Sequence, residues 1–192
     1  MSFAGSYLTR LSDKRPDAAI DAAVRQAIAL AEDLFKPDKF TGTWSVGGLG
    51  ITTIRPKDIA ATNQSSGLQG GVAGSGAWGV TAVTASTWTN WVSLNVDDRA
   101  YQVVTGIFNK TPQPYITNIK PFLNGQDMPI ISVEEMHVWE EQKAYFTNPY
   151  IVSPANKHQI QVWSPVTLAG VPSEQIGLMG YIIGKRAYLI QE

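Results

Sequence analysis

The sequence predicts a mainly β protein in which one N-terminal α-helix precedes an antiparallel β-sandwich. Charged residues make up only 16% of the 192 residues, against about 25% in ordinary domains. After residue 80, short runs of β-branched and aromatic residues recur between turn-forming residues. A second helical pattern of comparable length is missing, which argues against α/β folds and their nucleotide sites.

Residues 1–40 are predicted to form a helical segment. Pro16 is suited to the start of a helix, and Lys36-Pro37 is suited to its end. Between them, apolar residues recur at spacings of three and four: Ile20, Val24, Ala27, Ile28, Ala31 and Leu34. The opposite face is charged, so we expect the helix to lie on a surface, either docked on its own domain or against a neighbouring subunit.

Residues 41–79 are predicted to form a Gly/Thr-rich extended arm or loop. Six glycines fall within residues 67–79, a density that suits neither a helix nor a regular strand. The run Gly74-Ser75-Gly76-Ala77-Trp78-Gly79 matches the letters of a dinucleotide fingerprint. That fingerprint requires a following helix, whereas a Thr/Val-rich strand pattern follows here, so we expect no dinucleotide site.

Residues 80–192 are predicted to form the sandwich, and the three segments together form one domain. Expected strands cover 80–84, 87–96, 101–108, 115–123, 128–139, 144–152, 159–163, 175–183 and 186–190. The separating residues are typical of turns, for example Asn109-Lys110-Thr111-Pro112 and Ala169-Gly170-Val171-Pro172.

Composition excludes several classes of function. Cysteine is absent, which excludes thiol nucleophiles, disulfide scaffolds and cysteine-ligated metals. The formal net charge of −1 gives no electrostatic footprint for nucleic acid. The N-terminus lacks a signal-peptide pattern, and we expect a protein made in the cytosol. We expect no cofactor, no metal, no catalytic residue and therefore no enzyme activity.

The two histidines, His137 and His158, are candidate site residues. In a strand over 128–139, alternation places Glu135, His137 and Trp139 on one face, where they could ligate a metal, act as an acid–base pair or form a solvated edge. We favour the solvated edge. His158 lies in a turn-like composition, and we expect it on the surface.

The tryptophans carry the alternative function. Trp88, Trp91 and Trp139 could form an aromatic platform for a glycan. Large aromatic side chains also fill sandwich cores and subunit interfaces, and we favour that role.

The last third resembles viral coat proteins of the single jelly-roll type. The resemblance covers about residues 80–190 and rests on the strand rhythm of Tyr145-Phe146-Thr147-Asn148-Pro149-Tyr150-Ile151-Val152-Ser153-Pro154, of 159–163 and of 175–190. It implies a jelly-roll sandwich and a capsid component, of a phage or an archaeal virus, that self-assembles in the virion through non-covalent interfaces.

This resemblance also implies partners: further copies of the chain, other virion proteins and possible proximity to an internal membrane. No basic arm precedes the sandwich, so direct binding of the genome is not expected. The expected intersubunit contacts are Ile20, Val24, Ile28, Leu68, Val72 and Trp78. The alternative hypothesis for the function is a carbohydrate- or receptor-binding sandwich module at a fibre or tail tip.

Overall fold

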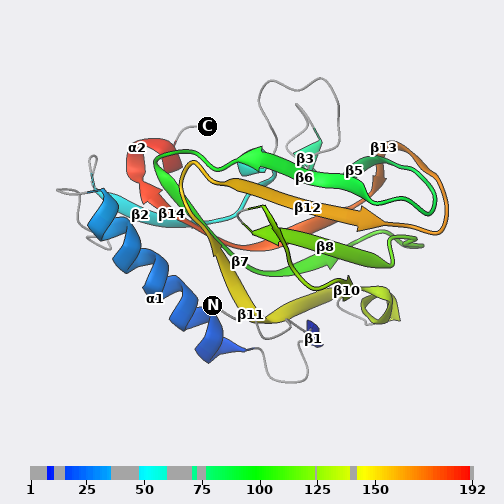
Figure 1. Ribbon diagram of the computed structural model, residues 1–192, viewed down its shortest axis with the longest axis horizontal. Helices are drawn as coiled ribbons and strands as arrows, with labels where there is room; N and C mark the ends of the chain where they lie inside the picture. Colours follow the sequence, from blue (N-terminus) through cyan, green and yellow to red (C-terminus); the bar gives the residue numbers. More distant parts are fainter. Residues whose placement is uncertain are drawn as a thin grey trace.

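A computed structural model describes residues 8–10, 16–35, 48–59, 71–72, 77–123, 125–138 and 142–190. Its longer strands form two antiparallel sheets (Figure 1). The helix sheet has the order β1-β11-β7-β14-β2, and the facing sheet has the order β10-β8-β12-β6, with β9 paired to β8. The bounds are β1 Leu8–Arg10, β2 Leu49–Thr53, β3 Gly71–Val72, β4 Ala77–Trp78, β5 Val80–Val83, β6 Thr89–Asn95, β7 Ala100–Asn109, β8 Asn118–Leu123, β9 Gln126–Asp127, β10 Ile131–Ser132, β11 Lys143–Val152, β12 Lys157–Trp163, β13 Leu168–Glu174 and β14 Ile176–Lys185.

The protein is therefore mainly β, with antiparallel sheets and one long N-terminal helix, as the sequence predicts. One hydrophobic core lies between the sheets and joins β7 side chains such as Val104 and Ile107 to Ile160 and Val162 of β12. The sandwich also includes β2, which pairs with β14, so it begins before residue 80.

The strand pairings are nested along the chain. From the outside inward, β2 pairs with β14, β5 with β13, β6 with β12, β7 with β11 and β8 with β10. Such nesting describes one long antiparallel ribbon folded back on itself. Two further pairings, β14 with β7 and β12 with β8, join different turns of the ribbon and roll it into a sandwich.

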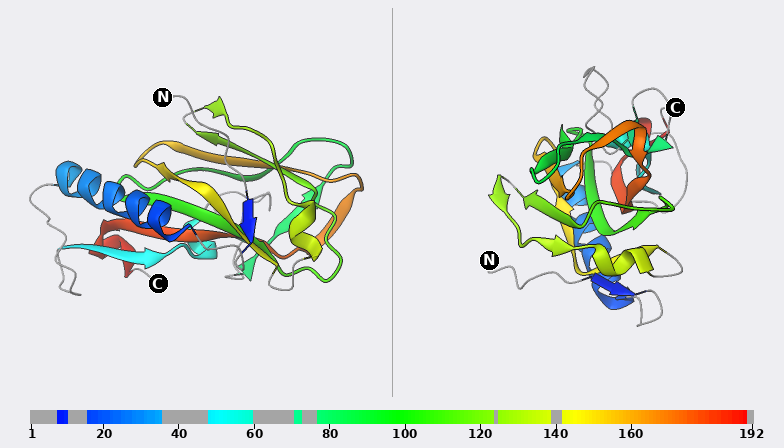
Figure 2. Two further views of the ribbon diagram at one scale, coloured as in Figure 1. Left: turned by 90° about the horizontal axis from the view of Figure 1, so that it is seen from below. Right: turned by 90° about the vertical axis from the view of Figure 1, so that its right-hand side faces the viewer.

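Helix α1 (Asp17–Leu34) lies on the outer face of the helix sheet, along β11, β7 and β14 (Figure 2). Three alanines on its buried stripe, Ala23, Ala27 and Ala31, allow the backbone to approach the sheet closely. They pack against Tyr101, Val103 and Ile183 of the sheet. The helix is thus docked on its own domain, and it covers only part of the face on which it lies.

Four local expectations are wrong. The strand expected over 128–139 is only β10, because Glu134–Val138 form the 3₁₀ helix η2. The strand expected at 186–190 is instead the short helix α2 (Arg186–Leu189). The turn expected at 169–172 lies within β13. The Gly-rich segment was expected to contain no regular strand, but β3 and β4 pair there as a short two-stranded sheet.

Candidate functional site

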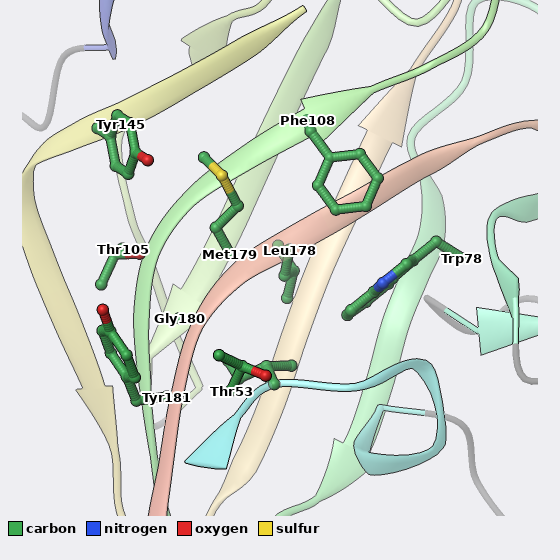
Figure 3. A pocket seen from close by; sticks show the side chains of 10 residues that line it. Thr53, Trp78, Thr105, Phe108, Tyr145, Leu178, Met179, Gly180 and Tyr181 are labelled. Carbon is green, nitrogen blue, oxygen red and sulfur yellow. The ribbon is translucent and has the colours of Figure 1, made fainter. Parts of the chain in front are cut away.

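A half-open pocket lies on the outer face of the helix sheet, on the part that α1 leaves uncovered (Figure 3). Its volume is about 340 Å³, within the lower range of small-molecule sites. Side chains from β2, β4, β7, β11 and β14 line it, together with Ile54 just after β2. The lining residues are Thr53, Ile54, Trp78, Thr105, Phe108, Tyr145, Leu178, Met179, Gly180 and Tyr181.

One wall of the pocket is an aromatic corner. The rings of Trp78 and Phe108 meet edge to face, with centroids 5.8 Å apart and planes at 87°, a favourable geometry for an aromatic pair. Gly177 creates the space for this pair. A Cβ at Gly177 would lie 2.3 Å from Phe108 Cζ and 2.7 Å from Trp78 Cδ2, so any side chain there would displace the corner.

The floor of the pocket is formed by Met179, which stands opposite a second glycine, Gly106. Figure 3 shows the Met179 side chain between the Tyr145 and Phe108 rings. A Cβ at Gly106 would lie 2.8 Å from Met179 Cε and 2.3 Å from the Ala144 carbonyl oxygen. Gly106 therefore keeps β7 and β11 close together while leaving room for Met179. Methionine adapts its shape readily, so this floor can adjust to an occupant.

Hydroxyl groups supply the polar part of the lining. Thr53, Thr105, Tyr145 and Tyr181 each contribute one, and Trp78 contributes an indole N–H. Within the described part of the chain, no hydrogen bond is formed by the side-chain hydroxyls of Thr53, Thr105 or Tyr181. The pocket therefore offers aromatic surface beside hydrogen-bonding groups that are open to an occupant, and none of the described residues that line it is charged.

A second aromatic group lies on the facing sheet. The Lys120 ammonium is 5.0 Å from the centre of the Trp88 ring and 5.1 Å from the centre of the Phe122 ring. The same ammonium lies 3.8 Å from the Asp127 carboxylate. Lys120 thus covers the ring of Trp88 on which a sugar would stack, and this group is a cation–π cluster within the chain.

Amide side chains continue this surface along β6 and β12. Asn90 Oδ1 accepts hydrogen bonds from Gln159 Nε2 at 3.0 Å and from Gln161 Nε2 at 3.1 Å. The amides therefore bind one another across the two strands.

A buried chain of polar groups connects the two sheets. His158 of β12 is fully buried, and its Nδ1 lies 2.7 Å from Gln102 Oε1 of β7. Gln102 Nε2 donates to the Asp58 carbonyl oxygen at 3.2 Å. Oε1 of Gln102 is therefore an acceptor, and Nδ1 of His158 carries the proton. His158 Nε2 then accepts from the Tyr150 hydroxyl at 3.2 Å.

Burial controls the ionisation of this chain. It lowers the pKa of His158 to about 4 because charging the ring in an apolar core is costly. Burial likewise raises the pKa of Tyr150. Both groups are neutral near pH 7 and serve as structural hydrogen-bonding partners. The expectation that His158 lies on the surface is wrong, because its β12 position faces the core.

A buried carboxylate holds the loop before β8. Glu174, 1% exposed, accepts hydrogen bonds from Asn109 Nδ2 at 2.8 Å and from the Ile116 amide at 2.9 Å. The Tyr115 amide donates to the same carboxylate. Its oxygens are engaged by these donors and are turned into the protein, which indicates a structural role.

The predicted contact residues are placed as follows. Trp78 lines the pocket. The side chain of Ile20 lies on the buried stripe of α1 and is 2% exposed, which leaves it little surface for a contact with a second subunit. Val24 and Ile28 are half-buried against the hydrophobic cluster between α1 and the helix sheet. Leu68 and the side chain of Val72 lie outside the described residues.

Of the three residues of the predicted glycan platform, the structure describes Trp88 and Trp91. Trp91 is fully buried in the core, which is the role favoured for it from the sequence, and it is not available to a glycan. Trp88 belongs to the cation–π cluster, and Trp139 lies outside the described residues. Sequence reasoning missed the pocket residues other than Trp78, although the three closely spaced glycines Gly177, Gly180 and Gly184 in a strand pattern were a signal of close packing.

The predicted acid–base candidates do not form a site among the described residues. Glu135 lies in η2, so strand alternation does not align it with position 137. The His137 side chain is outside the described residues. Asp97, a carboxylate that the sequence does not single out, binds Arg99, with 2.8 Å between Arg99 Nε and Asp97 Oδ1, and this hydrogen bond holds the pKa of Asp97 below its usual value. Within the described ranges, no group of three histidine or carboxylate side chains could hold a metal ion.

Comparisons with protein-family models, with curated proteins and with solved structures find no match to this chain. Among the described helices, none is long and apolar enough to cross a membrane.

Proposed function

We propose that the chain is a structural protein of a virus or phage particle and that its sandwich is a jelly roll. The nested strand order carries the proposal. The eight strands of the ribbon can be numbered 1 to 8 in chain order, as β2, β6, β7, β8, β10, β11, β12 and β14. With these numbers, the helix sheet contains the order 1-8-3-6 and the facing sheet has the order 2-7-4-5. These orders support the proposal because a jelly roll is built from a ribbon rolled in this way, and viral capsid domains share that fold with lectins and cupins. The step to a capsid is an analogy between folds.

Exposed apolar side chains on α1 support the proposal that the chain assembles with further copies. Leu30 and Leu34 follow each other at i and i+4 on α1, where they are 41% and 54% exposed. The two leucines form an apolar pair at the C-terminal end of the helix, beside the buried stripe. Interface cores are depleted in charge, and the low charge of the chain agrees with this. The proposed partners are further copies of the chain and other virion proteins, in the virion after synthesis in the host cytoplasm.

Light scattering across a concentration series tests the proposal. We expect masses at large multiples of 20.9 kDa, with closed particles visible by electron microscopy. Leu34→Glu should reduce the assembled mass because it places a charge in the proposed interface. Gln26→Glu is the matched control, since it adds the same charge at an exposed position of the same helix. A monomer at all concentrations, or equal assembly of both variants, contradicts the proposal.

A further inference from the structure

We propose that the pocket bounded by Trp78, Phe108 and Tyr181 binds a neutral carbohydrate, as one or two sugar rings. This inference goes beyond assembly, and it moves carbohydrate binding from Trp88 to the opposite sheet. Three features of the pocket carry it: its size, its lack of charge and its combination of ring faces with unengaged hydroxyls.

The size of the pocket suits a small ring compound. A volume of about 340 Å³ equals about eleven water molecules at roughly 30 Å³ each. That is room for one sugar ring with some bound water, or for two rings with the second partly outside. The pocket is half-open, so a longer glycan could continue into solvent.

The charge of the lining restricts the chemistry of the ligand. The ten lining residues include no lysine, arginine, histidine, aspartate or glutamate. Among these ten side chains, a phosphorylated, sulfated or carboxylated ligand would find no cation to compensate for its lost hydration. A cationic ligand would equally find no carboxylate. The pocket therefore favours a neutral ligand.

The polar groups distinguish a sugar from an aliphatic ligand. Thr53, Thr105 and Tyr181 hydroxyls have no hydrogen-bond partner within the described part of the chain, and an aliphatic chain would displace their water without replacing it. A sugar supplies hydroxyls to these groups while its C–H face lies against an aromatic ring. The Trp78 and Phe108 rings meet at 87°. Because the Lys110 ammonium lies 5.6 Å from the centre of the Phe108 ring, the stacking face for a sugar is assigned to Trp78.

The Tyr181 ring has a fixed position at one side of the pocket. It packs against the hydrophobic cluster between α1 and the helix sheet. This packing, together with the position of Tyr181 in β14, fixes the location of its hydroxyl. Figure 3 shows this hydroxyl on the same side as Thr105. A ligand between the aromatic corner and Tyr181 would therefore contact both kinds of group at once.

Saturation-transfer NMR on the full chain, followed by calorimetry, tests the proposal. The probes are glucose, galactose, mannose, N-acetylglucosamine, lactose and maltose, with glucose 6-phosphate and octanol as chemical controls. We expect binding of at least one neutral sugar and weaker or no binding of glucose 6-phosphate and octanol. Lack of binding by every neutral sugar at millimolar concentration overturns the proposal, as does preferential binding of octanol.

Three variants locate the binding. Trp78→Ala should lower the affinity by about tenfold or more, since it removes a stacking face. Tyr181→Phe removes one hydroxyl and should lower the affinity by about threefold to tenfold with the fold retained. Trp88→Ala, on the facing sheet, is the matched control and should leave binding unchanged. Binding that survives the first two variants, or that depends on Trp88, overturns the assignment to this pocket, whatever the assembled mass is.

Discussion

The stability of this protein should fall as the pH falls from 7 toward 4, because His158 is buried in its neutral form. Burial lowers the folded-state pKa of His158 to about 4, whereas an unfolded chain has a histidine pKa of about 6.5. Between these values the unfolded state binds the proton and the folded state does not. Linkage then requires stability to be lost with decreasing pH, at up to about 1.4 kcal/mol per pH unit.

The magnitude follows from the two pKa values. Lowering the pH from 7 to about 4.5 should cost about 2 kcal/mol through His158 alone. Below the folded-state pKa the group has no further effect on stability. Asp97 acts in the same direction but at lower pH, because its stabilising effect is lost only below the ordinary aspartate value of 3.8. The two contributions therefore separate along the pH axis.

Urea unfolding at a series of pH values measures this effect. His158→Gln is the matched variant, because it retains a hydrogen-bonding side chain and does not titrate. We expect the wild-type stability to approach that of the variant by about 2 kcal/mol between pH 7 and 4.5. Parallel curves would refute the reasoning, as would an imidazole NMR signal of His158 that titrates near pH 6.5 in the folded protein.

Three further outcomes are expected, each measured against the wild type by urea unfolding. Gly177→Ala should destabilise by about 1–3 kcal/mol and change the tryptophan fluorescence, because its Cβ would meet Phe108 and Trp78; unchanged emission contradicts this. Glu174→Ala should cost about 1–3 kcal/mol, since the Asn109 amide and two backbone amides lose their acceptor, and a neutral result would count against that role. Ala27→Leu should cost about 1–3 kcal/mol by overpacking, because Ala27 is fully buried between α1 and the sheet; a stabilised variant would show that the helix sits further out.

The elements that were predicted well are those in which one residue pattern determines the structure. The spacing from Ile20 to Leu34 predicted α1, and the alternation in 144–152 predicted β11. At Arg186–Leu189 the residue pattern also predicts a strand, but the structure has a helical turn that buries Arg186 and Leu189. Tertiary packing, which the local pattern does not encode, decided the latter case.

His158 shows why polar residues in a β protein are hard to place from sequence. Its neighbours Asn156, Lys157 and Gln159 are typical of a turn, yet β12 alternation puts His158 inward and Gln159 outward. What permits the inward position is a pair of partners, Gln102 and Tyr150, each on another strand of the other sheet. Sequence reasoning had no means to bring the three together before the strand pairing was known.

The pocket depends on pairing even more strongly than the buried histidine does. Trp78 and Phe108 lie 30 positions apart and meet because Gly177, nearly 70 positions further along from Phe108, leaves space beside both rings. The β14–β7 register opposes Gly177 to Phe108 and Met179 to Gly106. Phe108 and Met179 thus each stand opposite a glycine, a pattern that alternation within a single strand does not contain. A shift of β14 by one residue would turn Gly177 and Met179 to the other face of the sheet and remove the pocket, so the site is a property of the strand register.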